Sequence, residues 1–368
     1  MARSYDHLYP QLTSFENLYL AFRKAAKGKR GQPSVAVFEF NLEENLLLLQ
    51  DELRAGTYRP GAYASFYISD PKRRLISAAP FRDRVVHHAL CNIIEPVFER
   101  TFIEDSFANR VGKGTHRALD RAQGFARRYP FVLQCDIRQF FPSVDHAILF
   151  DILARKIGDA RVLELCNHVL QSGEGILAGE YEMVYFPQDD PTQGSGQGLL
   201  ARFRPRGLPI GNLTSQFWAN LYLNELDQFV KRQLRCPAYL RYVDDFLLFS
   251  SQKSELWAWK DGIREQLIGL RLCLHERRST VYPVANGIPF LGFRVYPTHR
   301  LLKQRNKWAF ARRLRGWYSR IARGEMQLGD MERRIQGWVA HARHGDTWSL
   351  RRVILGGLVP RSGVRMDY

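Results

Sequence analysis

Cysteines are few in this sequence, and they are scattered. The chain has 5 cysteines among 368 residues, and none of them belongs to a Cys-x-x-Cys pair. Because disulfide frameworks and structural zinc sites need paired or closely spaced cysteines, neither is expected. The sequence also lacks any apolar run of the roughly 18 residues that would span a membrane. Its start, Met-Ala-Arg-Ser-Tyr-Asp, has no apolar segment of the signal-peptide type. We therefore expect a cytoplasmic protein that has no membrane partner.

Acidic residues are in the minority. The chain carries 54 Lys and Arg against 37 Asp and Glu, a formal net charge of +17. Such an excess favours a polyanionic partner, and with no membrane segment in view nucleic acid is the better candidate. A hydrophobic fraction of 45% argues against disorder, and a chain of this length typically forms two or three domains.

Two adjacent carboxylates lie between two apolar runs. Pro237–Arg241 and Phe246–Ser250 are rich in Tyr, Phe and Leu, which is typical of strands, and Tyr242-Val-Asp244-Asp245 connects them. Neighbouring like charges repel each other unless a cation lies between them, and carboxylate oxygens are the ligands that hard divalent cations prefer. The sequence therefore predicts a metal site here, although a bare Asp-Asp pair is also compatible with a polar hairpin turn.

A third carboxylate ends another apolar run far upstream. Phe131–Asp136 reads as a buried strand that finishes in Asp136. Helical patterns follow over 145–156 and 160–171, before the hairpin that carries Asp244 and Asp245. A strand, helices and a hairpin in this order fit a split βαβ sheet, which would bring the strand ends together. We therefore expect the three aspartates to form one cluster.

The region to about residue 128 is expected to be mostly helical, with helices from Ser14, over 35–52 and from Phe81 to Phe98. Between the last two lies a run of three cations, Lys72-Arg73-Arg74. Lysine and arginine side chains in such a run can bind a triphosphate, and the alternative is a solvated basic turn.

A glycine-containing motif opens a later helix. After a Gly/Pro/Gln-rich insertion, Ile210-Gly211 leads into an amphipathic helix from Thr214 that carries Gln216 near its start. The glycine can also be explained by close packing at a helix N-terminus.

These blocks, in this order, resemble a reverse transcriptase. The resemblance is carried by Lys72-Arg73-Arg74, Asp136-Ile-x-x-Phe-Phe141, the Gly211–Gln216 helix start, Tyr242-Val-Asp-Asp245, Leu274-His-Glu-Arg-Arg278 and Phe290-Leu-Gly-Phe293. Most members of the family have Gln-Gly-x-x-x-Ser-Pro where this chain has Ile210-Gly-Asn-Leu-Thr-Ser-Gln216. The form found here, and the stretch Trp338–Trp348, resemble the diversity-generating retroelement branch.

The resemblance implies an α+β fold of the right-hand polymerase type. The fingers would cover residues 1–128, the palm with its split βαβ sheet 129–297 with an insertion at about 172–207, the basic helical thumb 298–352, and a tail 353–368. The implied activity is RNA-directed DNA synthesis from dNTPs, error-prone at template adenines, in a bacterial or phage-encoded system. The implied partners are a template-repeat RNA, the RNA/cDNA duplex and a small basic accessory variability protein that is oligomeric.

The same resemblance assigns roles to residues. Asp136 and Asp244 would bind two Mg²⁺ ions, helped by Asp245 and the backbone carbonyl of Ile137. The positions expected to bind the nucleotide are Lys72, Arg73, Arg74, Phe141 as a steric gate against ribose, Ile210, Gly211 and Gln216. The expected primer grip is Phe290, Leu291, Gly292 and Phe293. Where the family often has a lysine, Arg277 and Arg278 stand in this chain, so a lysine general acid is not expected.

The end of the chain is basic and contains regularly placed tryptophans. Residues 298–352 hold 14 Lys and Arg against 4 Asp and Glu, interleaved with four tryptophans. Basic helices would suit contact with a template–primer backbone, and at least half of the tryptophans are expected in the core.

Two other functions remain possible. One is a bacterial reverse transcriptase of the group II intron or phage-defence type. No maturase or endonuclease extension follows the expected thumb, which argues against an intron protein. The other is a non-catalytic RNA-binding scaffold, which retention of all three aspartates disfavours.

Overall fold

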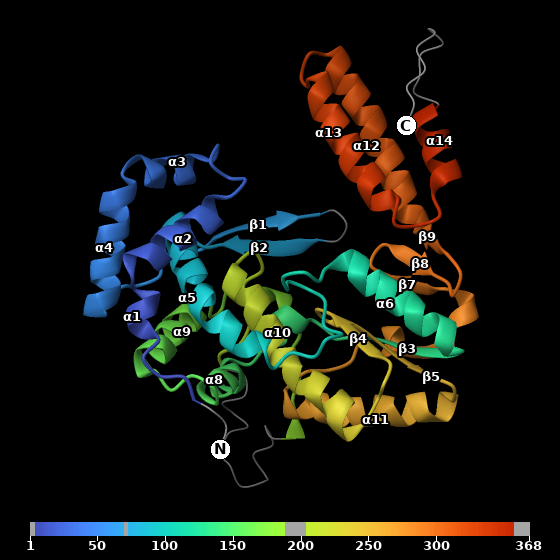
Figure 1. Ribbon diagram of the computed structural model, residues 1–368, viewed down its shortest axis with the longest axis horizontal. Coiled ribbons are helices and arrows are strands. Elements are labelled where there is room, and N and C mark those ends of the chain that lie inside the picture. Colours follow the sequence, from blue (N-terminus) through green and yellow to red (C-terminus); the bar gives the residue numbers. More distant parts are fainter. Residues whose placement is uncertain (1–3, 70–72, 188–203, 357–368) are drawn as a thin grey trace.

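The computed structural model describes residues 4–69, 73–187 and 204–356. Three regions follow one another along the molecule, as Figure 1 shows: an N-terminal helical lobe, a central sheet with helices on both faces, and C-terminal helices that stand on a small second sheet. Lys72 of the expected nucleotide-binding group lies outside the described residues. None of the described helices is both long and apolar enough to cross a membrane.

The N-terminal lobe is largely helical, as expected. Its helices are α1 (Tyr9–Leu12), α2 (Phe15–Ala26), α3 (Pro33–Phe40), α4 (Leu42–Ala55) and α5 (Phe81–Glu99). The side chain of Ser14 accepts a hydrogen bond from the Asn17 N–H, at 3.2 Å, and so caps α2. The prediction of a single helix over 35–52 is wrong. Asn41 leaves the helical region, with φ −112° and ψ 50°, and separates α3 from α4.

A β-hairpin between α4 and α5 was not anticipated. Strands β1 (Ala64–Ile68) and β2 (Arg74–Ala78) pair in antiparallel register. The sequence signal was weak because every residue of β1 is exposed, so no alternation of apolar and polar residues marks a buried face.

The central sheet has the strand order β4-β5-β3-β6, and each neighbouring pair is antiparallel. The strands are β3 (Phe131–Asp136), β4 (Tyr239–Tyr242), β5 (Asp245–Ser250) and β6 (Thr280–Pro283). Strands β3 and β4 are therefore parallel with β5 between them. The chain connects them through α7 (Phe140–Ser143), α8 (His146–Ala154), α9 (Ala160–Ser172) and α10 (Leu213–Gln228). This is the expected split βαβ arrangement.

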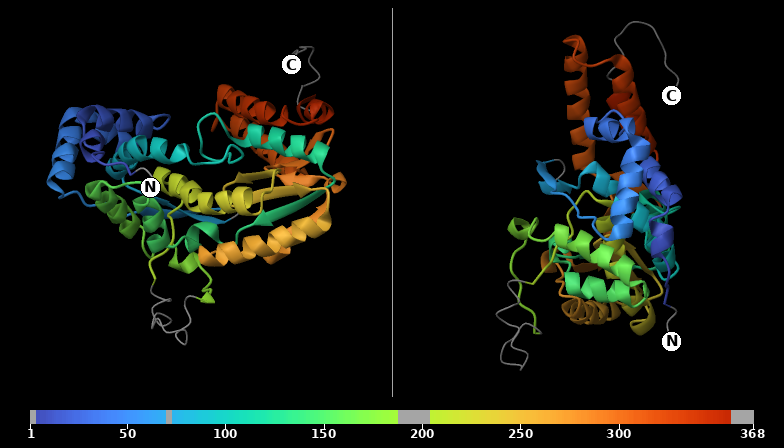
Figure 2. Two further views of the ribbon diagram at one scale, coloured as in Figure 1. Left: turned by 60° about the horizontal axis from the view of Figure 1, so that its bottom comes forward. Right: turned by 90° about the vertical axis from the view of Figure 1, so that its left-hand side faces the viewer.

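Both faces of this sheet are buried, which explains why β5 is apolar without interruption. Phe246 and Leu248 belong to one hydrophobic cluster, and Leu247 and Phe249 belong to another. Helix α11 (Lys253–Gly269) covers the first face and α6 (Thr115–Arg128) the second (Figure 2). Alternate side chains of a strand point to opposite faces, so each cluster receives every second residue.

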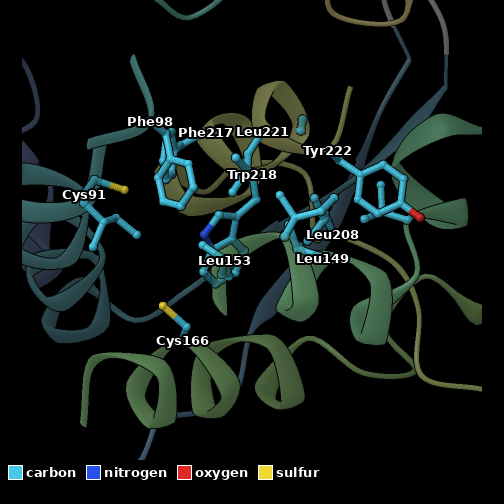
Figure 3. Close-up of a cluster of buried hydrophobic side chains, with 14 of the residues drawn as sticks. Cys91, Phe98, Leu149, Leu153, Cys166, Leu208, Phe217, Trp218, Leu221 and Tyr222 are labelled. Carbon is cyan, nitrogen blue, oxygen red and sulfur yellow. The ribbon is translucent and has the colours of Figure 1, made fainter. Parts of the chain in front are cut away.

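A cluster of buried side chains joins the N-terminal lobe to the sheet region. In Figure 3, Trp218 of α10 lies among side chains from α5, α8 and α9, including Phe98 and Leu153. Cys91 and Cys166 are fully buried there and act as small apolar side chains. The cluster fixes α10, and through it the loop that precedes this helix, against the N-terminal lobe.

The C-terminal region begins with a small sheet of β7 (Ile288–Phe290), β8 (Phe293–Val295) and β9 (Arg300–Leu302). Helices α12 (Gln304–Ala322), α13 (Leu328–Ala342) and α14 (Trp348–Gly356) follow it (Figure 1). Phe310 and Trp338 stack at 3.9 Å between ring centroids, and Trp317 packs edge-on against Phe310. Trp308 and Trp348 are exposed, whereas Trp317 and Trp338 are half-buried and pack against the buried residues of this region. At least half of the four tryptophans were expected in the core, and two of them contribute to it in this partly buried way.

Candidate active site

Two of the expected aspartates lie opposite each other where the two inner strands of the central sheet end. Asp136 is the last residue of β3 and Asp245 the first residue of β5, and the two are direct partners in the antiparallel register. Asp244 lies in the two-residue turn between β4 and β5. All three are partly exposed. The fold therefore brings carboxylates that are far apart in the sequence to one edge.

The turn that carries Asp244 is strained. Val243, its first central residue, has a φ of 57°. Positive φ is unusual for a β-branched residue, and two-residue hairpins normally place glycine or asparagine at such positions. Strain of this kind costs on the order of 1–3 kcal/mol and persists only where the surroundings impose it.

A buried arginine supplies part of that constraint. Arg241 donates a hydrogen bond from Nη1 to the carbonyl oxygen of Val243, at 3.1 Å. Its Nε and Nη2 bind the two carboxylate oxygens of Asp227 on α10 at 2.7 and 2.6 Å, and Tyr239 Oη donates to the same carboxylate at 2.6 Å. Burial opposes the charge of Arg241, but Asp227 and Tyr239 outweigh it and raise the pKa of the guanidinium. The turn that carries Asp244 is thus attached to α10 through a fully buried ion pair.

The roles of Arg241 and Asp227 were not expected from the sequence. A usable signal was present, because Arg241 is a charged residue inside an otherwise apolar strand. Such a residue is stable in a core only with a buried partner of opposite charge.

Cations from later segments lie beside the carboxylates. Arg278 Nη1 donates to Asp136 Oδ2 at 2.8 Å. Burial lowers the pKa of Lys303, and the negative charge of Asp245 opposes that shift. Lys303 therefore lies within electrostatic reach of the second carboxylate.

The carboxylates suit a divalent cation by their chemistry, since hard ions prefer oxygen ligands. Within residues 4–69, 73–187 and 204–356, however, no three His, Cys, Asp or Glu side chains are grouped so that they could hold a metal ion. At Asp136 the charge of a cation is already supplied by Arg278. Ile137 forms a β-bridge with Leu274. The two hydrogen bonds of this bridge run from the His275 N–H to the Asp136 carbonyl oxygen and from the Arg138 N–H to the Cys273 carbonyl oxygen, so the bridge does not use the Ile137 carbonyl.

The loop before α10 is attached to the β1–β2 hairpin. The Ser77 N–H donates to the Ile210 carbonyl oxygen at 2.8 Å, and Asn212 Nδ2 donates to the Ser77 carbonyl oxygen at 2.9 Å. Gly211 has a φ of 122°, and a Cβ at this position would lie 3.1 Å from Ile76 Cγ2. Both the backbone conformation and the close approach to β2 therefore require glycine. Gln216 is exposed on the first turn of α10.

The remaining nucleotide-binding candidates lie on the hairpin and on α7. The Arg73 guanidinium stacks over the ring of Tyr67, 4.0 Å from its centroid, and Arg74 is the exposed first residue of β2. Phe141 is half-buried on α7, where its ring packs edge-on against Phe140 at 5.4 Å.

The expected primer grip is a tight hairpin with only its turn at the surface. Phe290 and Phe293 are paired partners in β7 and β8, and both rings are buried in the core. Leu291 and Gly292 connect them with φ values of 43° and 90°. The Lys303 N–H donates to the Gly292 carbonyl oxygen at 3.0 Å and so ties this turn to the start of α12. Of the four expected residues, only the two in the turn are open to contact.

Comparison with known proteins agrees with this geometry. Residues 69–295 match the family described as reverse transcriptase (RNA-dependent DNA polymerase). Protein YkfC of Escherichia coli is 27% identical over 312 residues, which cover 74% of this chain and 75% of YkfC. The group II intron-encoded protein LtrA of Lactococcus lactis is 26% identical over 236 residues, which cover 61% of this chain but only 35% of LtrA.

Among solved structures, apo telomerase from Candida tropicalis aligns with a TM-score of 0.45 and 12% identity, over 65% of this chain and 48% of that one. The family match covers more than half of the sequence and includes all three aspartates. The chain belongs to the reverse transcriptase (RNA-dependent DNA polymerase) family and has the α+β fold of those polymerases.

Proposed function

We propose that this reverse transcriptase belongs to the diversity-generating retroelement branch, and that it copies a template-repeat RNA into cDNA with frequent errors opposite adenine. The supporting observation is the motif Ile210-Gly211, with Gln216 in place of the usual proline. Its position supports a role in template reading, because the backbone of Ile210 is bonded to β2 next to the helix start.

Although no three such side chains are grouped for metal binding in the described residues, we propose that Asp136, Asp244 and Asp245, with the carbonyl of Ile137, come together to hold divalent ions, two Mg²⁺. Bound there, the ions would lower the pKa of the primer 3′-hydroxyl and neutralise the triphosphate. The chain itself would keep the two opposed carboxylates in register through β3 and β5, and would hold the strained turn through Arg241.

The nucleotide would lie between the palm, residues 129–297, and the fingers, residues 1–128. We assign the triphosphate to Lys72, Arg73 and Arg74, because arginine forks match phosphate oxygens. Phe141 would close the space beside the sugar C2′. We assign Ile210, Gly211 and Gln216 to contact with the nucleotide and template, since Gly211 lies against β2 and Gln216 is exposed on the first turn of α10.

The thumb, residues 298–352, would bind the RNA/cDNA duplex. Helix α12 has no acidic residue, and its arginines at 305, 312, 315 and 320 are exposed. Neutralisation of phosphates by such side chains would supply most of the affinity and make it dependent on salt. The turn of Leu291 and Gly292 would contact the primer end. We assign template choice to an oligomeric basic accessory protein, because charge alone does not select a sequence.

A primer-extension assay tests the catalytic assignment. Asp244→Asn is expected to abolish cDNA synthesis in the presence of magnesium. RNA affinity should remain close to that of the wild type, because the basic thumb supplies it. Robust synthesis by this variant would overturn the assignment, and loss of RNA binding would show that the change disrupts the fold.

Sequencing the cDNA made by the wild type and by Ile210→Gln tests the proposed errors opposite adenine and the role of Ile210 in them. A glutamine can hydrogen-bond near the incoming nucleotide where isoleucine offers only shape, and one such bond is typically worth about 0.5–1.5 kcal/mol. We expect misincorporation opposite adenine to fall by several-fold to about tenfold, with similar or higher efficiency on correct pairs. Equal adenine error rates in both enzymes would remove Ile210 from the mechanism.

One alternative has its own support. The similarity to LtrA favours a group II intron-like enzyme. That alternative predicts faithful copying of adenines by the wild-type enzyme, so the same sequencing experiment separates the two.

A further inference from the structure

The outer half of the β1–β2 hairpin is bonded to a segment that follows α9. Tyr67 Oη, near the end of β1, donates to Glu180 Oε1 at 2.9 Å. The same Tyr67 ring lies beneath the Arg73 guanidinium. Glu180 ends the short 3₁₀ turn Ala178–Glu180 in the insertion between α9 and α10. The ring of Tyr67 thus contacts Arg73, which we propose binds the triphosphate, and its hydroxyl contacts Glu180 of the insertion.

The insertion segment is in turn bonded to the loop that follows β3. Gln139 Nε2 donates to the Glu180 carbonyl oxygen at 3.0 Å, and Gln139 Oε1 accepts from the Glu182 N–H at 3.0 Å. Arg138 and Glu182 also form an ion pair. Gln139 has a φ of 46° and lies in the loop between Asp136 and Phe141.

We propose that Tyr67, Glu180 and Gln139 form a strap that positions Arg73 of the fingers relative to the catalytic loop of the palm. This inference rests on the proposed role of Arg73 in binding the triphosphate. In this arrangement residues 180–182 support the nucleotide site, although none of the three strap residues has to touch the reacting atoms. They are positioning residues.

Strand β1 of the hairpin needs such a support because burial gives it little. All five residues of β1 are exposed, so packing contributes little to holding the strand. Its base is attached to the α10 loop through Ser77 and Ile210, but this bond lies on β2, away from the end that carries Tyr67 and Arg73. Without the strap, ordering of that end would have to occur each time a nucleotide binds, and the affinity would fall accordingly.

The two contacts of Tyr67 can be separated by substitution, because one is made by its hydroxyl and the other by its ring. Tyr67→Phe removes only the hydroxyl that binds Glu180 and keeps the ring beneath Arg73. The matched control is Tyr63→Phe, because the Tyr63 hydroxyl makes a longer contact, 3.4 Å, with Ser172 Oγ and lies outside the strap. Glu180→Ala removes the acceptor, whereas Glu180→Gln keeps an oxygen that can accept from Tyr67.

The experiment measures steady-state incorporation on an RNA template together with hydrogen exchange of residues 64–68. Tyr67→Phe and Glu180→Ala should raise the KM for dNTP by about three- to tenfold, the effect of one hydrogen bond, with kcat and the Kd for primer–template unchanged. Exchange of the hairpin amides should be faster in both variants. Glu180→Gln should restore most of the wild-type behaviour, and Tyr63→Phe should match the wild type.

A second comparison shows whether the strap acts through Arg73. Arg73→Gln should itself raise the KM for dNTP, and adding Tyr67→Phe in that background should raise it no further. Additive effects of the two changes would overturn the proposal, as would a Tyr67→Phe enzyme that matches Tyr63→Phe in both KM and exchange. If the wild-type protein makes no cDNA, the proposed function fails, and the exchange of residues 64–68 still decides whether the strap holds the hairpin.

Discussion

At the residue scale, cations of this chain lie beside the carboxylates of the candidate active site. Arg278 is bonded to Asp136, and Lys303 lies near Asp245. A metal ion that binds Asp136 at the bonded oxygen has to displace the guanidinium. In the proposed metal site the two positive charges would compete for one carboxylate, so we expect Arg278, one of the two arginines where the family often has a lysine, to weaken metal binding.

Arg278→Gln is expected to tighten metal binding. The ion pair is half-exposed on the arginine side, and such pairs are worth about 0.2–1 kcal/mol, so the Kd for Mn²⁺ should fall by up to about fivefold. A calorimetric titration without nucleotide measures it. Arg277→Gln is the control, since it removes the same charge from the neighbouring position. Equal Kd values for the two variants would show that Arg278 does not compete.

Phe141→Ala is expected to relax sugar selection. Removing the ring opens space beside the expected position of the nucleotide C2′, so ribonucleotides should be incorporated more readily. The measurement is the ratio of kcat/KM for dNTP and rNTP. If the ratio stays constant while stability falls, Phe141 acts only as a core aromatic against Phe140.

At the scale of elements, the start of α10 links the hairpin to the palm. Gly211 allows this close approach, because it has a positive φ and its backbone lies against Ile76 of β2. The residues before and after Gly211 are both hydrogen-bonded to Ser77 of β2: the Ile210 carbonyl oxygen accepts from the Ser77 N–H, and Asn212 Nδ2 donates to the Ser77 carbonyl oxygen. A change at this glycine should therefore disturb two elements together.

Gly211→Ala is expected to destabilise the protein by about 1–3 kcal/mol, because alanine disfavours this φ and its methyl group would crowd Ile76. Gly124→Ala is the matched control. Gly124 lies inside α6 with open space around it, so alanine there should stabilise by about 0.5–1 kcal/mol. Urea unfolding of both variants measures these effects. Two changes of the same sign would contradict the account of Gly211.

At the scale of the whole molecule, buried histidines limit stability in acid. Burial lowers the pKa of His87 to about 3, and both of its ring nitrogens lack a hydrogen-bond partner. Burial also lowers the pKa of His88 to about 4, with Lys29 and Lys24 adding to the shift. The unfolded chain takes up these protons near pH 6.5 and the folded chain does not, so stability is lost as pH falls from about 6.5 toward 3.

His87→Leu is expected to reduce this acid sensitivity. Between pH 7.5 and pH 5, His87 alone should cost the wild type roughly 2 kcal/mol of unfolding free energy, and the variant should be spared that loss. Urea denaturation at the two pH values measures the difference. His7→Asn, at an exposed position with positive φ, is the control and should behave as the wild type. A loss in His87→Leu as large as that in the wild type would show that other groups cause the sensitivity.

Much of the palm could be predicted from the chain itself. The apolar strands, the aspartates at their ends and the helices between them follow from local patterns, because burial on a sheet or helix face imposes its period on neighbouring residues. The order of these elements then restricted the topology to a split βαβ sheet, which places Asp136 beside Asp245. The basic character of the C-terminal helices likewise follows directly from their composition.

Other features were decided only by the tertiary structure. The exposed strand β1 has no buried face, so its sequence carries no period from which to predict it. The pairs Arg241–Asp227 and Arg278–Asp136 join residues that lie apart in the chain, and whether two charges meet depends on how the elements pack. The rings of Phe290 and Phe293 were expected at the primer, but they face the core because β7 and β8 pair beneath α6. Local periodicity determines which segments form elements, whereas partner choice across the fold depends on contacts that no single segment contains.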